Sequence, residues 1–260
     1  MRLHLLELGD QPWLPRSLRL GVVETLQQLT DVFDPYGASL ERFADLLAAG
    51  RPEVVVDLCA GAGGPWRRLG RLLAARGCRP RVVLTDALPD PSGAVAGGGG
   101  PLEVRMHEAP VDPRRVPADL GGARTMFNAL HHFRPAEIRE IVRDAAAAGE
   151  VLACLEITEK RPAAFLGIFL VPVGALLVAP WRRPIRLRRI FWTFFLGAIP
   201  LVTLLDGLVS CLRSYAPDEL LALAREAAPH YVWEAGRERG SSWLPFRGTW
   251  LVGRPATAEA

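Results

Sequence analysis

The chain contains very little lysine and cysteine. All but one of its 31 basic residues are arginine, and Lys160 is the exception. The four cysteines (Cys59, Cys78, Cys154 and Cys211) form no C-x-x-C pair, and none stands at metal-ligand spacing from a histidine. These features exclude a disulfide-rich secreted domain and a cysteine-based zinc centre. We expect free, mostly buried thiols and no metal site.

Excess charge and a long apolar N-terminus are also missing. The formal net charge is +3 over 260 residues, which is too small to indicate a nucleic-acid partner. Met1–Glu7 reaches an acid before any apolar core can form, so no secretory signal is expected. We therefore expect a cytoplasmic protein. Half of the residues are hydrophobic, enough for one elaborated α/β domain or two small ones.

The first 50 residues are expected to form a helical lead-in or lid. Apolar residues recur at helical spacing in two runs, which Asp34-Pro35-Tyr36-Gly37 separates. Trp13 lies in an unpatterned stretch before the first run. It could contact a substrate, or it could only anchor packing.

Residues 51–158 alternate between short apolar runs and helical patterns, which predicts a doubly wound, mostly parallel sheet with right-handed crossovers. The expected strands are Val54–Leu58, Arg81–Asp86, Leu102–Met106, Ala123–Ala129 and Glu150–Thr158, and the expected helices are Trp66–Arg76 and Pro135–Ala148. Residues 213–260 add a helix, Pro217–Ala227, and a closing strand pair, Tyr231–Ala235 and Thr249–Val252. The complete sheet is expected to have seven strands.

The first strand runs into a glycine loop that contains Gly61 and Gly63. Small residues there let backbone N–H groups approach a ligand beyond the carboxyl end of the strand. Asp57, at the strand end, could hold the loop or accept a hydrogen bond from a cationic amino group. Asp86 ends the neighbouring strand, where a carboxylate suits the ribose hydroxyls of a nucleoside.

Two residues distinguish among nucleoside cofactors. A dinucleotide loop has the pattern G-x-G-x-x-G, which this loop matches in neither register: counted from Cys59 the first glycine is missing, and counted from Gly61 the last position is occupied by Trp66. A bulky residue at that position obstructs the close packing that supports a pyrophosphate. A cofactor without phosphates is therefore favoured, and an NAD-dependent oxidoreductase is the less favoured alternative.

The order of these motifs resembles that of the class I (seven-stranded, Rossmann-like) S-adenosylmethionine (SAM)-dependent methyltransferases. The resemblance rests on Asp57-x-Cys59-x-Gly61-x-Gly63, Asp86, Val111-Asp112 and Leu130-His131-His132-Phe133. It implies SAM as cofactor and S-adenosylhomocysteine as product. The cofactor-binding residues that it implies are Asp57, Cys59, Ala60, Gly61, Gly63, Asp86, Ala87, Val111, Asp112 and Asn128.

The resemblance gives Asp112 a contact with the adenine amino group, although the residue could instead cap a helix. The Asp/Asn-Pro-Pro-Tyr motif of many DNA and protein amino-group methylases is absent after the fourth strand, where Phe127-Asn128-Ala129-Leu130 stands instead. We therefore expect a small-molecule acceptor and no nucleic acid.

Catalytic candidates follow the fourth and fifth strands. An imidazole of His131 or His132 could remove a proton from the acceptor, although such a pair also occurs as plain packing. Glu156 is an acid on an otherwise apolar strand, and it could act in the site or only cap the strand end. Arg213 and Tyr215 could line the same opening and contact substrate.

The segment 159–212 is not explained by the methyltransferase pattern. Pro162–Trp181 and Ile190–Leu205 carry no charge, and five arginines lie between them: Arg182, Arg183, Arg186, Arg188 and Arg189. Each half approaches the length of a membrane span, but arginines at the outer tip of a spanning hairpin oppose the positive-inside rule. The segment 162–205 could be a lid over a hydrophobic substrate, a membrane-surface hairpin whose arginines meet head groups, or a homodimer contact.

The sequence therefore predicts a SAM-dependent methyltransferase for a small, hydrophobic, natural-product or lipid-like acceptor, cytoplasmic or peripheral at the inner membrane face. The alternative from another class is a membrane-associated binding module that keeps the fold without turnover.

Overall fold

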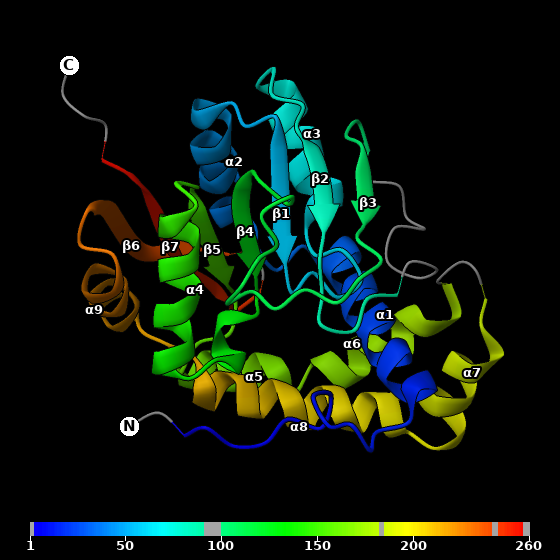
Figure 1. Ribbon diagram of the computed structural model, residues 1–260. Helices are drawn as coiled ribbons and strands as arrows, with labels where there is room; N and C mark the ends of the chain where they lie inside the picture. The colour runs from blue at the N-terminus through cyan, green and yellow to red at the C-terminus, as the bar shows by residue number, and fades with distance from the viewer. Residues whose placement is uncertain (1–2, 91–99, 182–184, 241–243, 257–260) are drawn as a thin grey trace.

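One seven-stranded sheet forms the centre of the protein (Figure 1). The computed structural model describes residues 3–90, 100–181, 185–240 and 244–256. The strand order is β3-β2-β1-β4-β5-β7-β6. The strands are β1 (Val54–Leu58), β2 (Arg81–Leu84), β3 (Val104–Met106), β4 (Ala123–Phe127), β5 (Leu152–Glu156), β6 (Tyr231–Arg239) and β7 (Arg247–Pro255).

The strand directions confirm the predicted fold class. β1 to β5 pair in parallel, whereas β7 is antiparallel to both β5 and β6. The last two strands extend well beyond the Tyr231–Ala235 and Thr249–Val252 that their apolar residues predict. Charged residues continue this hairpin because its outer part need not be buried on both faces.

Helices cover both faces of the sheet, which explains the unbroken valine run of β1. Val55 packs in the core under α2 (Ala38–Gly50) and α3 (Trp66–Ala75). Val56 points the other way, into the core under α4 (Pro135–Ala147) and α9 (Pro217–Ala227). The serine and glycines of Ser92–Gly100 predict a loop between β2 and β3, and all of it except Gly100 lies outside the described residues.

The topology turns at one place, between β1 and β4. From β1 the chain builds outward to β2 and β3, and from β4 it builds in the opposite direction to β5. The connections after β1 and β4 therefore diverge at the carboxyl edge of the sheet. Such a switch point is where open α/β sheets bind their ligands.

The segment 159–212 covers this carboxyl edge. It comprises α5 (Pro162–Ile168), α6 (Val171–Val178), η2 (Ala179–Trp181), α7 (Leu187–Ile190), η3 (Phe191–Phe195) and α8 (Ala198–Arg213). Figure 1 shows α5, α6 and α8 as a layer across the ends to which the strand arrows point, with α1 (Arg16–Phe33) beside them. We call α5 to α8 the helical layer.

The helical layer packs tightly on α1. A Cβ on Gly174 of α6 would lie 2.8 Å from Leu29, and one on Gly21 of α1 would lie 2.7 Å from Ile199 of α8. Gln28 Nε2 also donates a 2.7 Å hydrogen bond to the Val178 carbonyl oxygen. The layer is therefore part of the globular body.

Two parts of the helical layer have the length and composition of a membrane span. Pro162–Trp181 is long and apolar enough as a single stretch. Leu187–Phe195 and Ala198–Arg213 are long and apolar enough only when taken together, and a bend of 74° separates them.

The arginines between the two apolar halves were expected to meet lipid head groups, and the structure contradicts this for Arg189. Glu24 of α1 is buried and accepts bonds from Arg186, at 2.5 Å, and Arg189, at 2.8 Å. Arg188 lies 3.4 Å from the same carboxylate. The Arg189 side chain is only 1% exposed, so the expectation that it meets head groups is wrong. Arg182 and Arg183 lie outside the described residues.

Replacing Glu24 by alanine should destabilise the protein by on the order of 3 kcal/mol, because Arg189 would lose the carboxylate that neutralises its buried charge. Glu226→Ala is the matched control, since the Arg139–Glu226 pair is exposed and screened by solvent, so its loss should cost much less. Urea unfolding of both variants measures the difference. Equal losses would mean that the Glu24 cluster does not hold the helical layer.

Candidate functional site

The glycine loop after β1 is a strained turn. Gly61, Gly63 and Gly64 all have positive φ, and so does Cys59, at 56°. Cys59 thus adopts a conformation that favours glycine, at the position where a dinucleotide loop counted from it has its first glycine. Helix α1 packs against the loop: Val23 would lie 3.4 Å from a Cβ on Gly61, and Gln27 Nε2 donates a 2.8 Å bond to the Gly64 carbonyl oxygen.

Asp57 holds this loop from beneath. Its carboxylate is fully buried and accepts hydrogen bonds from Trp66 Nε1, at 2.8 Å, and Thr125 Oγ1, at 2.7 Å. Burial raises its pKa to about 7, and the two hydrogen bonds oppose that rise. Of the two roles that the sequence leaves open for Asp57, the geometry supports the structural one. Trp66 is buried against Phe127 and fills the space below the loop.

Asp86 connects the ends of β2 and β1. Its Oδ2 accepts a 2.9 Å hydrogen bond from the Gly61 N–H, and its Oδ1 accepts one from the Leu88 N–H. The residue is half-buried at the carboxyl edge. Because a carboxylate offers about four acceptor positions, both oxygens can still accept from hydroxyl groups of a ligand.

The other predicted cofactor residues lie beside this contact. The Ala60 N–H donates to the Thr85 carbonyl oxygen, and the Val111 N–H donates to that of Asp86, so the loops after three strands meet. Ala87 is exposed next to them. The Asp112 carboxylate is occupied by the guanidinium of Arg114, whose Nη2 lies 2.8 Å away, and this pairing lowers the pKa of Asp112.

The end of β4 turns sharply at Asn128, which has a φ of 51°. Its Oδ1 accepts a 3.2 Å hydrogen bond from the Ile157 N–H and so ties β4 to β5. The turn leads into η1 (Leu130–His132), which carries both predicted histidines.

His131 and Glu156 form a buried pair. His131 Nδ1 lies 2.6 Å from Glu156 Oε2, and the other carboxylate oxygen accepts a 2.8 Å bond from the Leu130 N–H. If Nδ1 carries the proton, Nε2 is left as an acceptor, the tautomer that a base requires. Nε2 lies 3.9 Å from Glu7 Oε1. Thr158 Oγ1 also approaches Nδ1, at 3.4 Å.

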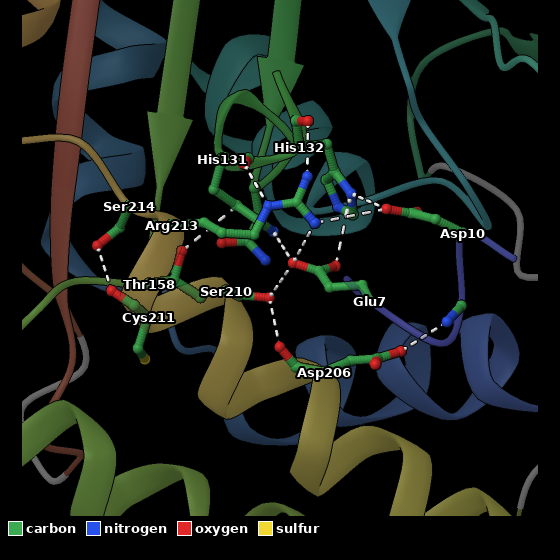
Figure 2. A network of polar contacts seen from close by, with 12 residues as sticks. Glu7, Asp10, His131, His132, Thr158, Asp206, Ser210, Cys211, Arg213 and Ser214 are labelled. Carbon is green, nitrogen blue, oxygen red and sulfur yellow. Dashed lines mark hydrogen bonds and ion pairs between the residues drawn. The ribbon is translucent and has the colours of Figure 1, made fainter. Parts of the chain in front are cut away.

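Residues 3–14 form an N-terminal segment, of which Glu7 and Asp10 lie beside His131 and His132 (Figure 2). Glu7 is buried beside both histidines, and Asp10 Oδ2 lies 3.0 Å from His132 Nδ1. Asp206 of α8 accepts hydrogen bonds from the N–H groups of Leu8 and Gly9 and so fixes the segment. Sequence reasoning did not identify Glu7 or Asp10, because their partners are more than 100 positions away and no local pattern marks them.

Arg213 joins the segment to η1. Its Nε donates to the His131 carbonyl oxygen at 3.0 Å and its Nη2 to that of His132 at 2.7 Å, while Nη1 lies 3.2 Å from Glu7 Oε1 (Figure 2). The geometry therefore gives Arg213 a positioning role. Tyr215 is buried and donates to the Phe133 carbonyl oxygen, whereas Trp13 is 65% exposed.

Glu7, His131 and His132 also place three metal-ligand atoms within 4.8 Å of one another. Arg213 already supplies a cation at hydrogen-bonding distance from the Glu7 carboxylate. A divalent ion between Glu7 and the histidines would meet that guanidinium at close range. We therefore interpret the cluster as an ion-pair network.

The comparisons with known proteins bear on the fold. No protein-family profile and no curated protein matches the chain. Among solved structures, a Rhodobacter sphaeroides protein described as a Zn-dependent alcohol dehydrogenase aligns with a TM-score of 0.50 and 11% identity, over 91% of this chain and 98% of that one. At such identity the likeness extends to the fold alone.

Proteins described as methyltransferases also appear among the solved structures. A protein described as an O-methyltransferase, from Nostoc punctiforme, aligns over 96% of this chain with a TM-score of 0.49 and 11% identity. Human N-acetylserotonin methyltransferase, in complex with SAM, aligns over 93% with a TM-score of 0.49 and 13% identity. The chain covers 63% and 56% of their lengths. The fold class itself rests on the strand order of the sheet.

The contact between His132 and Asp10 should weaken as the pH rises. Burial opposes the charge on His132, but the hydrogen bond to Asp10 and the charge of Glu7 outweigh it and raise the pKa of His132. A raised histidine pKa stabilises the fold fully below the unfolded-state value, about 6.5, and this stability is lost as the pH passes the folded value.

The test is the difference in unfolding free energy between wild type and His132→Gln across this pH range. We expect the difference to shrink with rising pH. A pH-independent difference would contradict the assignment, and His230→Gln, at an exposed turn, provides the control.

Proposed function

We propose that the protein is a SAM-dependent methyltransferase that acts on a small, apolar acceptor. The observation that carries the proposal is the bond between the Gly61 N–H and the Asp86 carboxylate, at the switch point of the sheet. It brings a glycine turn and a ribose-type carboxylate into one site. SAM, when bound there, supplies an electrophilic methyl group on a sulfonium sulfur.

The chain's own residues fit this cofactor better than a dinucleotide. Asp86 has acceptor positions left for the two ribose hydroxyls. Trp66 begins α3 and is buried where a Rossmann loop, counted from Gly61, has its last glycine, and its bulk opposes the close helix packing that a pyrophosphate requires. The Asp57 carboxylate already accepts hydrogen bonds from Trp66 and Thr125. The methionine end of SAM would therefore bind backbone groups of the glycine loop.

Asp86→Ala should weaken SAM binding by about tenfold or more, because hydrogen bonds to a charged acceptor are lost. Isothermal titration calorimetry of wild type, Asp86→Ala and the control Asp119→Ala measures this. Asp119 is an exposed acid near the opposite edge of the sheet. Equal affinity in wild type and Asp86→Ala would overturn the assignment, and binding of NAD in place of SAM would favour the oxidoreductase alternative.

We assign His131 as the base and Glu156 as the residue that positions it. An acceptor hydroxyl or amine would form its new bond to the methyl carbon as the carbon–sulfur bond breaks. His131 Nε2 would accept the proton that the acceptor loses, and the imidazolium would be stabilised by Glu156 at Nδ1. His131 is 2% exposed beneath Glu7, so acceptor entry requires movement of the N-terminal segment.

His131→Ala should lower kcat by about a hundredfold or more while leaving the SAM dissociation constant unchanged. Glu156→Gln should lower kcat less and shift the pH profile, because it changes the basicity of His131. The assay measures transfer of a tritium-labelled methyl group to a panel of lipophilic phenols, alcohols and amines, with His230→Ala as control.

Unchanged rates in His131→Ala would mean that alignment alone drives transfer. SAM binding by the wild type without transfer to any member of the panel would favour the alternative of a binding module without turnover.

A further inference from the structure

The described part of the helical layer exposes many large apolar side chains. Of the 23 large hydrophobic side chains that are exposed in the described part of the chain, 15 lie between Leu166 and Leu205. The most exposed include Leu166, Leu177, Trp181, Leu187 and Phe195, at 63 to 82%. Soluble monomers rarely expose so many neighbouring apolar groups without a partner.

The inner side of the same helices packs against the rest of the protein. Helix α6 packs on α1 through Gly174, and α8 packs on α5, where Ile168 would lie 2.9 Å from a Cβ on Gly207. Glu24 fixes α7 through Arg189. The helices therefore cannot leave the body to span a bilayer without breaking these contacts, and only their outer side is available.

A cationic cavity borders this layer at the start of α5. It has a volume of about 390 Å³, and four of its lining residues are arginines: Arg161, Arg237, Arg239 and Arg247. Glu238 also lines it, and Arg161 pairs with Glu159. The hairpin that carries the cavity packs on α5, because Pro245 and Phe246 would lie within 3.0 Å of a Cβ on Gly167.

The arginines of this hairpin lie so close together that their positive charges repel each other. Arg239 and Arg247 are directly opposite each other in the β6–β7 register, and Arg237 lies two residues from Arg239, on the same face. Like charges directly opposite each other destabilise a strand pair. A bound anion would remove this repulsion, so the pattern points to an anionic ligand.

We propose that the outer side of the helical layer, with the arginine cavity at its edge, binds the surface of an anionic lipid bilayer. The exposed apolar side chains enter the boundary between head groups and acyl chains, and the arginines contact lipid phosphate. The protein then lies on the membrane with the carboxyl edge of its sheet toward the lipid.

A bilayer fits this surface better than a second copy of the chain does. Protein interfaces stay about 56 to 65% apolar, with polar groups that fix their register. Pro162–Trp181 and Ile190–Leu205 carry no charge at all. In a symmetric dimer the arginine cavities would need acidic partners, whereas lipid phosphates satisfy them directly.

Vesicle flotation of the full chain tests the proposal, and it requires neither SAM nor an acceptor. One set of vesicles contains phosphatidylcholine alone, and the other also contains phosphatidylglycerol. Wild type should float with both and bind the anionic vesicles more tightly. Leu177→Glu combined with Phe195→Glu should weaken binding to both by about tenfold or more. Arg239→Gln combined with Arg247→Gln should remove the preference for phosphatidylglycerol.

Matched controls are Val232→Glu, an exposed apolar residue on β6, and Arg254→Gln, an exposed arginine at the far end of β7. Neither should change flotation. Wild type that stays soluble with both vesicles would overturn the proposal. So would light scattering that shows a dimer which the Leu177 and Phe195 substitutions dissociate. Flotation without SAM binding would leave this proposal standing and refute only the proposed function.

Discussion

The geometry of the candidate site depends on the contacts that Arg213 makes. At the end of α8, it donates to the carbonyl oxygens of His131 and His132 and pairs with Glu7. One side chain thereby joins the helical layer, the turn after β4 and the N-terminal segment. Because Arg213 and Glu7 are both buried, removing either would leave an uncompensated charge. The network therefore fixes where the two histidines point.

The sheet and glycine loop are readable from the sequence because their signals are local. A valine run buried on both faces, glycines at positive φ and an acid at each strand end all lie within about 35 residues. His131 and Glu156 could be named for the same reason, since Glu156 ends a recognisable strand and His131 follows shortly after another. Their direct pairing follows once β4 and β5 are neighbours, which the strand order supplies.

The remaining site residues depend on contacts that no local pattern marks. Helix α1 shows why: its apolar spacing predicts that Leu26 is buried, yet Leu26 is 44% exposed while Glu24, Thr25 and Gln28 are buried. The buried side of α1 includes Glu24 and Gln28 because it meets Arg189 and a carbonyl oxygen of the helical layer, which are more than 140 residues away. The same long-range partnership neutralises arginines that, in the sequence, appear free for head groups.

The helical layer thus has two sides with opposite requirements. Its inner side contributes Asp206, Ser210 and Arg213 to the polar network, and its outer side exposes aromatic and aliphatic groups. A lid that only excluded water would gain nothing from an apolar exterior, and burying that exterior in lipid would lower its free energy. An acceptor dissolved in the bilayer would then start on the side of the protein that the carboxyl edge faces. The N-terminal segment and the helical layer would separate that acceptor from His131, so their movement would control access to the site.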